Sequence, residues 1–438
     1  MVATNLLTDA LTRLTFCFPR NPLNHSSSFL SPTIRDFIFV HILHVIGSLD
    51  PADGGPPEAV RQFVQAHPLV GDTAEAVCVD RPGASFLSNW PCPVHALGPA
   101  ALGRFGLSPR LWEWLGINAS RFDGIVMNGV WTFPPLAVRA MARRSGVPYA
   151  VFPHGSLDPW FQQAYPLKHG KKLLYWPLQY PVFRDAAAVC FTCSMEADLA
   201  RTSFSPHTWR DAVIPLATSG PAGDAASDIA AFYDAVPSVR DRRFFLFLAR
   251  FHEKKGCDLL IEAFARVAAS APDVDLVMAG PDQMSWQAQL RRMAWEAGIA
   301  DRVHWPGQLA GSVKWGALRA AEAFVLASHS ENFGIAVIES LAAGRPVLIT
   351  NKVNIWPEIQ SNGVGIVEDD TVDGTERLLR GWLGMPAAEQ AAMATRAQPF
   401  VMRQYSAESI ASSIHQLFKN TGGRSMQSSG GSKPAKVA

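Results

Sequence analysis

Short apolar runs of strand length alternate with helix-length segments along nearly the whole chain. This alternation restricts the fold more than any other feature, because strands and helices in regular alternation form parallel sheets covered by helices on both faces. The fold class is therefore predicted as α/β. We expect strands at residues 38–46, 74–79, 124–127, 149–152, 187–192, 244–249, 276–279, 303–305, 323–327, 347–350 and 365–367.

The length of 438 residues indicates more than one domain, because a single hydrophobic core rarely grows past roughly 250–300 residues. The periodicity fades over residues 217–241, where Ala, Gly, Ser and Asp are frequent, and resumes with the strand expected at 244. We therefore predict two Rossmann-like domains, at 38–216 and 242–405, joined by a linker at 217–241. Residues 1–37 are expected to be a poorly ordered extension, and 421–438 a disordered tail.

The composition excludes several classes of protein. Hydrophobic residues make up 48% of the chain and charged residues 18%, which is typical of a folded globular protein. A net charge of +1 gives no overall preference for nucleic acid. The six scattered cysteines do not suggest a disulfide framework and favour a reducing compartment. The chain has neither G-x-G-x-x-G after a strand nor a P-loop sequence, so dehydrogenases and P-loop NTPases lose their main support.

A strand–loop–helix unit in the second half carries the main candidate site. The strand expected at 323–327 leads into a loop with Glu331 and Gly334, and a helix follows at 335–343. Free N–H groups at the helix start can bind a diphosphate, and Gly334 lets the backbone approach it closely. Glu331 and Glu339 can accept hydrogen bonds from sugar and ribose hydroxyls. By spacing alone, however, an exposed loop acid and an exposed helix acid fit better.

Two cations, Arg250 and Lys255, follow the first strand of the second half. At the carboxyl end of a strand they could clamp a diphosphate and stabilise charge on the leaving group. The alternative is a solvated basic turn.

Three residues of the first half could face the same ligand. Gly54 and Gly55 follow the opening strand, where a glycine pair permits close backbone approach to phosphate, although this signal is weak. His154 follows the strand at 149–152 between Pro and Gly, which favours exposure to a crevice. A structural histidine fits the pattern about equally well.

A basic and aromatic segment follows, containing Lys168, Lys171, Lys172 and Trp176. Such a helix suits an anionic membrane surface or a lipid-linked acceptor. A solvated helix face is the alternative interpretation.

Residues 331–339 read Glu-Asn-Phe-Gly-Ile-Ala-Val-Ile-Glu, and Leu-Ala-Ala-Gly-Arg-Pro-Val follows at 341–347. This segment closely resembles the E-x(7)-E motif of glycosyltransferase family 4, whose members have the GT-B fold. Residues 250–256 resemble the family's G-R-x-x-x-x-K-G element, with Ala249 in place of the first glycine. The resemblance extends over the second half of the chain and, more loosely, over most of the first.

The resemblance implies a GT-B fold, in which two Rossmann-like domains face each other across a cleft and a helix at 406–420 crosses back to the first domain. It also implies the roles of individual residues. His154 and Glu331 would act at the sugar, and Glu339 would hold the ribose. The other residues expected to bind the donor are Gly54, Gly55, Arg250, Lys255, Asn332, Phe333, Gly334 and Ile335.

The implied function is that of a retaining glycosyltransferase, which moves a hexosyl unit from a nucleoside diphosphate sugar to an acceptor hydroxyl. Polysaccharide, lipopolysaccharide or other glycoconjugate assembly is the expected setting, with a glycan or lipid-linked acceptor and peripheral membrane contact. The expected location is the cytoplasm or the inner face of its membrane. A GT-B sugar-nucleotide epimerase and a noncatalytic sugar-nucleotide-binding protein are the alternatives.

We expect neither a cofactor nor a metal ion. The cations Arg250 and Lys255 and a helix N-terminus would stabilise the diphosphate instead. The sequence Asp273-Val274-Asp275 resembles a metal-binding D-x-D. It lies where a strand is expected to start, however, and not at its carboxyl end.

Overall fold

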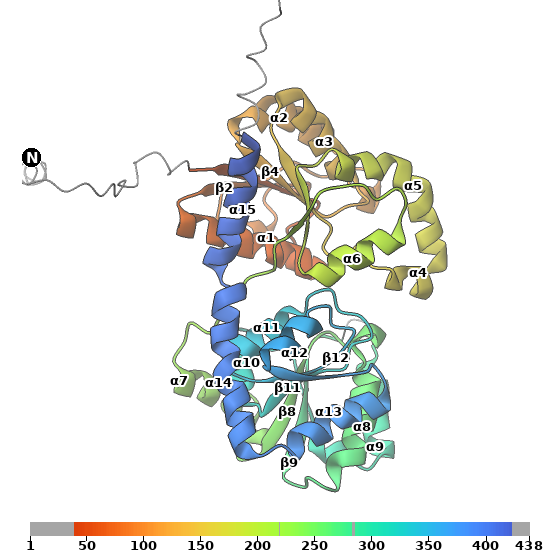
Figure 1. Cartoon of the computed structure of the whole chain (residues 1–438), viewed down its shortest axis with the longest axis vertical. Helices are drawn as coiled ribbons and strands as arrows, with labels where there is room; N and C mark the ends of the chain where they lie inside the picture. Colours follow the sequence, from red (N-terminus) through yellow and green to blue (C-terminus); the bar gives the residue numbers. More distant parts are fainter. Residues whose placement is uncertain (1–38, 219, 283–284, 423–438) are drawn as a thin grey trace, which may run out of the picture. The chain divides into compact units, whose positions relative to one another are not determined.

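The computed structural model describes residues 39–218, 220–282 and 285–422. These residues form two parallel β-sheets packed against helices, which confirms the α/β class (Figure 1). The expectation for residues 1–37 and, from residue 423 on, that for the tail at 421–438 lie outside the described residues, whereas residues 421 and 422 end a helix. No helix in the described ranges combines the length and the apolar character needed to cross a membrane.

The N-terminal domain contains a seven-stranded parallel sheet with the order β3-β2-β1-β4-β5-β6-β7. In β1, Ile42 pairs with Ala74 on one side and with Gly124 on the other, so the strand order reverses at β1. The strands are β1 (His41–Ile46), β2 (Thr73–Cys78), β3 (Val94–Ala96), β4 (Gly124–Asn128), β5 (Tyr149–Phe152), β6 (Ala188–Phe191) and β7 (Asp211–Val213). The helices are α1 (Gly55–Ala66), α2 (Pro109–Asn118), α3 (Phe133–Ser145), α4 (Trp160–Ala164), α5 (Pro166–Arg184) and α6 (Ser194–Ser203).

The C-terminal domain contains a six-stranded parallel sheet with the order β10-β9-β8-β11-β12-β13. Leu246 of β8 pairs with Val277 and with Phe324, so here the order reverses at β8. The strands are β8 (Arg243–Leu248), β9 (Val274–Ala279), β10 (Val303–Gly307), β11 (Ala323–Leu326), β12 (Val347–Thr350) and β13 (Gly365–Glu368). The helices are α7 (Ala225–Ala235), α8 (Cys257–Ala268), α9 (Gln287–Glu296), α10 (Gly311–Ala320), α11 (Ile335–Ala342), α12 (Trp356–Asn362), α13 (Val372–Leu383) and α14 (Ala387–Gln404). A further helix, α15 (Ala407–Gly422), follows them in the chain.

The two strand-order reversals fix where ligands can bind. In an open parallel sheet, the loops after two neighbouring strands separate at the reversal and leave a crevice beyond the carboxyl ends. In the C-terminal domain these loops follow β8 and β11. Four consecutive residues of β8, 244–247, are fully buried, because helices cover both faces of a parallel sheet. The loops are therefore attached to a rigid core.

The segment 217–241, predicted as a linker, contains helix α7, which packs against α10. Asp224 caps α7 by accepting a hydrogen bond from the Ser227 N–H. Buried Asp228 of α7 pairs with Arg319 of α10 at 2.8 Å. The helix was not predicted because Phe232 is its one large, fully buried side chain, so the sequence shows little apolar periodicity there.

The last described helix, α15, lies beside α1 of the N-terminal domain (Figure 1). Ile410, Ile414 and Phe418 join the buried cluster that contains Val40 of that domain. The ring of Phe418 occupies the space beside Gly124, where a Cβ atom would come within 2.4 Å of it.

Candidate functional site

A pocket of about 260 Å³ lies where the loops after β8 and β11 approach the N-terminal domain. It brings together five of the predicted site residues, which are far apart in the sequence: His154, Arg250, Lys255, Glu331 and Asn332. The other lining residues are Gly155, Trp160, Tyr165, His252 and Lys254.

The centre of the pocket is an ion pair between the Lys255 ammonium and the Glu331 carboxylate. Both side chains are largely buried, with 15% and 17% of their surface exposed. Gly256, with φ of +60°, lets the two loops meet, since a Cβ there would lie 1.9 Å from the carbonyl oxygen of Ala327. The Lys254 carbonyl accepts a hydrogen bond from the His329 N–H at 2.9 Å and holds the loops together.

The electrostatics of Lys255 favour an anionic ligand. Burial, together with the neighbouring cations Lys254 and Arg250, lowers the pKa of Lys255 to about 7. Arg250 is exposed at the mouth of the same pocket. A bound diphosphate would add negative charge beside both cations and so favour protonated Lys255.

We therefore expect the affinity for a nucleoside diphosphate sugar to fall about tenfold between pH 6 and pH 8. Lys255 is charged below its pKa of about 7 and loses its proton above it, while the bound diphosphate raises that pKa. Binding above pH 7 should thus take up one proton, measurable by calorimetry in buffers of different ionisation enthalpy. The intact nucleotide sugar suits this measurement, since a terminal phosphate itself titrates near pH 6.

Lys255→Arg is the matched variant for this experiment, because arginine stays protonated throughout the range. Its donor affinity should be independent of pH. An equal pH dependence in both proteins would show that a group other than Lys255 takes up the proton.

Glu331 is positioned by the loop between β12 and α12. Its N–H donates to the Lys352 carbonyl at 2.8 Å, and its own carbonyl accepts from the Asn354 N–H at 2.9 Å. Gly334, the N-cap residue of α11, has a φ of +79° that side-chain-bearing residues rarely adopt. A Cβ at Gly334 would also lie only 3.1 Å from Val337. The turn therefore requires glycine and brings the start of α11 close to Glu331.

In the predicted donor-binding segment, the side chain of Phe333 is buried and that of Ile335 is partly buried. Phe333 is 3% exposed, and its ring packs 5.6 Å from that of Tyr405. Ile335 packs against the core of the C-terminal domain. Both residues could therefore contact a donor mainly through their backbone groups.

Glu339 and the glycine pair lie outside this pocket. Glu339 forms an ion pair with Lys314 at 2.6 Å, and burial raises the pKa of its carboxyl, with a further contribution from the charge on Glu58. Glu58 lies in the first turn of α1, a helix that Gly54 caps and Gly55 begins. No atom lies within 4 Å of a Cβ placed on either glycine, so the space beside them is open.

His154 adopts a φ of +49°, and Gly155 follows at +73°, which turns the chain sharply after β5. Its ring stacks on Phe152, and its Nε2 lies 3.2 Å from the Asn128 Oδ1. Burial lowers the pKa of His154 to about 4, so the ring is neutral at pH 7. If Nε2–H donates to Asn128, Nδ1 is left as an acceptor for a sugar hydroxyl.

A buried carboxylate that the sequence analysis missed, Glu196, holds the turn at His154. It accepts hydrogen bonds from the Gly155 N–H at 2.9 Å and from the Thr192 N–H at 2.6 Å. Glu196 occupies the third position of α6, directly after β6. A glutamate three residues after a helix cap is a recognisable sign of a helix start. Its hydrogen bond to Gly155, in the turn after β5, can be seen only in the folded structure.

The loop that carries Glu331 also contacts the N-terminal domain on both sides of that residue. The Ser330 hydroxyl donates to Asp158 at 3.1 Å. The Asn332 amide donates to the Thr192 hydroxyl at 3.2 Å. The loop thus joins the two domains at the pocket.

The basic segment predicted to face a membrane is part of α5, and its residues divide between two faces. Trp176 is 4% exposed and packs against Phe204, so its predicted surface position is wrong. Lys172 points inward and donates to the Ser156 carbonyl at 3.3 Å. Lys168 and Lys171 are exposed.

Within the described ranges, no three His, Cys, Asp or Glu side chains come together in a group that could hold a metal ion. Asp275 of the D-x-D sequence instead lies in β9 and pairs with Arg242 at 2.6 Å.

Two parallel-sheet domains with a pocket at their junction define the GT-B class of fold. A family model described as glycosyl transferases group 1 matches residues 233–399, and one described as a glycosyl transferase 4-like domain matches residues 54–217. The chain belongs to the group 1 glycosyltransferases.

Similar proteins include a GDP-mannose:cellobiosyl-diphosphopolyprenol alpha-mannosyltransferase of Xanthomonas oryzae, 27% identical over 74% of this chain and 82% of the relative. A mannosylfructose-phosphate synthase of Agrobacterium fabrum is 36% identical, but this chain spans only 24% of its length. Among solved structures, Anabaena HepE in complex with UDP and glucose has a TM-score of 0.67 at 17% identity. That likeness covers 87% of this chain and 100% of HepE and shows the shared fold.

Proposed function

We propose that this protein is a retaining hexosyltransferase that moves a hexosyl unit from a nucleoside diphosphate sugar to an acceptor hydroxyl. The observation that carries this proposal is the Lys255–Glu331 ion pair beside Arg250 and His154. It places cations for a diphosphate next to acceptors for sugar hydroxyls.

Donor binding would exchange the partners of this pair. The diphosphate would attract the Lys255 ammonium, and the Glu331 carboxylate would then be able to accept hydrogen bonds from the sugar. Arg250 and the N-terminus of α11 would add to the stabilisation of the departing diphosphate. Neutral His154 would hydrogen-bond the sugar near the reacting carbon.

Glu331 is the single carboxylate among the described residues that line the pocket. In the donor complex this carboxylate would accept hydrogen bonds from the sugar hydroxyls, so no second carboxylate of the described pocket lining is left to act as a nucleophile. We therefore favour front-face attack. The acceptor oxygen bonds to the anomeric carbon as the bond to the diphosphate breaks, and the leaving phosphate oxygen takes the acceptor's proton. This route retains the anomeric configuration.

The proposal is tested with a thermal-shift panel of UDP-glucose, UDP-galactose, GDP-mannose and ADP-glucose, since a ligand that binds the native state raises its melting temperature. The stabilising donor is then incubated with and without acceptor glycosides. Release of nucleoside diphosphate and a product with the donor's anomeric configuration by NMR would support the proposal. Sugar isomerised without acceptor would identify an epimerase, and binding without turnover a noncatalytic protein.

We further propose that the protein works at the inner face of the cytoplasmic membrane, in glycoconjugate assembly with a glycan or lipid-linked acceptor. Support comes from α5, where Leu167, Lys171, Leu174 and Leu178 follow one another at helical spacing. Leu167 is 86% exposed, Leu174 84% and Leu178 59%. Exposed leucines beside lysines match the surface of an anionic bilayer.

Replacing Leu174 and Leu178 together by serine should weaken binding to vesicles of phosphatidylglycerol and phosphatidylethanolamine about tenfold or more, because burial of each leucine contributes roughly 1.5–3 kcal/mol when complete. Cosedimentation with the vesicles measures this. Leu69→Ser is the control, since Leu69 is 58% exposed on a different element. Equal vesicle binding by all three proteins would contradict the membrane proposal.

A further inference from the structure

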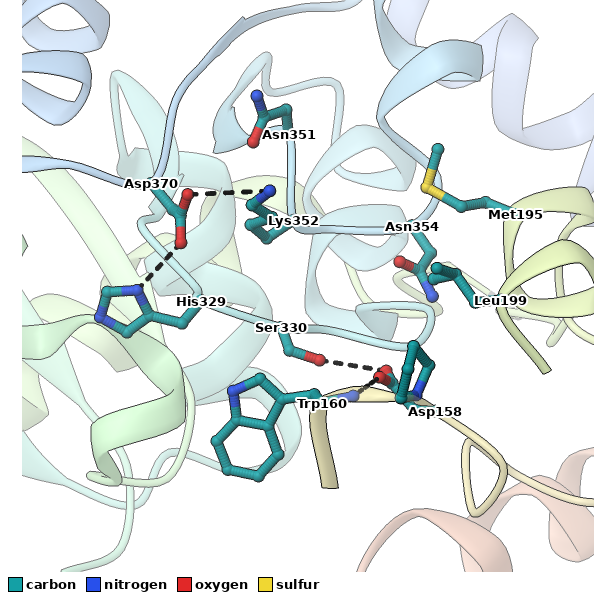
Figure 2. A pocket seen from close by; sticks show the side chains of 11 residues that line it. Asp158, Trp160, Met195, Leu199, His329, Ser330, Asn351, Lys352, Asn354 and Asp370 are labelled. Atoms are coloured by element: carbon teal, nitrogen blue, oxygen red, sulfur yellow. Dashed lines mark hydrogen bonds and ion pairs between the residues drawn. The ribbon is translucent and has the colours of Figure 1, made fainter. Parts of the chain in front are cut away.

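A second pocket, of about 620 Å³, adjoins the first and shares Trp160 with it. Figure 2 shows Asp158 and Ser330 meeting near Trp160 on one side of this pocket, and His329, Asp370 and Lys352 grouped on another. The loop between β12 and α12 lines the pocket with Asn351 and Asn354.

Two asparagine side chains at this pocket have hydrogen-bonding groups without a partner in the described part of the protein. The Asn354 side chain lines the pocket in a residue that is only 5% exposed, and it makes no hydrogen bond to the part of the chain that the structure describes. Asn351 donates to Asp369 at 2.7 Å, but its buried Oδ1 has no partner. A buried polar group left unsatisfied costs about 1–3 kcal/mol. The Asn354 amide has donor and acceptor groups to offer a ligand in the pocket.

The two carboxylates at this pocket, Asp158 and Asp370, already have hydrogen-bond or ion-pair partners within the protein. Asp158 accepts from the Trp160 N–H at 2.8 Å and from Ser330 at 3.1 Å. Asp370 pairs with His329 at 3.1 Å and approaches Lys352 at 4.0 Å. Such a lining does not select a strongly anionic ligand. Amides, carboxylates and an indole ring together match a ring with several hydroxyls and an apolar face.

We propose that this pocket binds a neutral sugar residue of the acceptor. The inference rests on the proposed transferase function and adds that the acceptor is a glycoside, not a simple lipid alcohol. Trp160 separates the two pockets, and Ser330 directly precedes Glu331 in the chain. The Asn354 N–H supports the Glu331 carbonyl at 2.9 Å. A sugar held by Asn354 therefore lies next to the donor site.

The test compares transfer with hydrolysis of the donor, in which water replaces the acceptor. The donor with the largest thermal shift is offered octyl glucoside, octyl mannoside, octyl galactoside or decanol, and release of nucleoside diphosphate is followed. We expect at least one glycoside, but not decanol, to accelerate release. In Asn354→Ala the KM for that glycoside should rise at least tenfold, far more than the KM for the donor.

Asn362→Ala is the matched control, since this asparagine of α12 bonds within its own helix, to the Glu358 carbonyl at 2.9 Å. Melting temperatures check the folding of both variants; loss of an unpartnered amide should not lower the value. The proposal is overturned if no glycoside accelerates release, or if Asn354→Ala leaves the glycoside KM unchanged. Absence of donor binding and hydrolysis in the unmodified protein would instead overturn the transferase function.

Discussion

An Arg250→Ala variant should release nucleoside diphosphate from the donor about 10²–10³ times more slowly than the unmodified protein, because removing one preorganised group that stabilises developing charge typically costs that much. Arg250 lies at the mouth of the pocket, beside Lys255. Its side chain is exposed, so the substitution should leave the melting temperature nearly unchanged. Single-turnover release of the diphosphate measures the chemical step.

Arg292→Ala is the control for this prediction. Arg292 is 67% exposed on α9 and pairs with Glu296 one turn away. It should show normal turnover. Arg250→Lys should restore part of the rate, because it keeps the charge but loses the planar guanidinium. Unimpaired release by Arg250→Ala would contradict the proposed chemistry of the leaving group.

Glu331→Gln should lower kcat/KM about 10²–10³-fold, comparable with the loss of a preorganised group that acts directly at the reacting centre. The substitution removes the acceptor for sugar hydroxyls. It also removes the carboxylate that favours the charged form of Lys255, so the pKa of Lys255 should fall. The residual activity should therefore have its optimum at lower pH.

A double-mutant cycle over Lys255→Met and Glu331→Gln separates these effects. Because each residue depends on the other, the double variant should be hardly worse than the more impaired single variant. The control is Asp228→Asn, which breaks a comparably buried pair with Arg319. It should lower stability without affecting kcat. Strictly additive losses at Lys255 and Glu331 would show that the ion pair has no part in the mechanism.

The sequence predicted the fold wherever burial left a continuous signal. The fully buried residues 244–247 form a continuous apolar run. Such a run is typical of a strand that is covered by helices on both faces of its sheet. The strands β3 and β7 have only three residues each, none of them buried, and carry no such run. Helix α5 was hard to delimit because Pro177 and Pro181 lie inside it, where proline normally ends a helix.

The site could be predicted only in part. Arg250, Lys255 and Glu331 lie at strand ends within recognisable segments, so the sequence identified them. Glu196 gave only the signal of a glutamate near a helix start, and Asn354 gave none. Each hydrogen-bonds a residue on another loop: the Glu196 carboxylate accepts from the Gly155 N–H, and the Asn354 N–H donates to the Glu331 carbonyl. Such partnerships arise only when the ends of parallel strands meet in the folded chain.

The loop at 330–332 has a thermodynamic consequence. Ser330 and Asn332 hydrogen-bond the N-terminal domain, while Glu331 between them faces the pocket. Ligand binding and the contact between the two domains therefore involve the same three residues. Coupling free energy is reciprocal, so a ligand that orders this loop strengthens the contact between domains, and strengthening that contact raises affinity for the ligand to the same extent. Substitutions of Asp158 or Thr192 that weaken the contact between the domains would thus lower the affinity for the donor, although neither residue is expected to touch it.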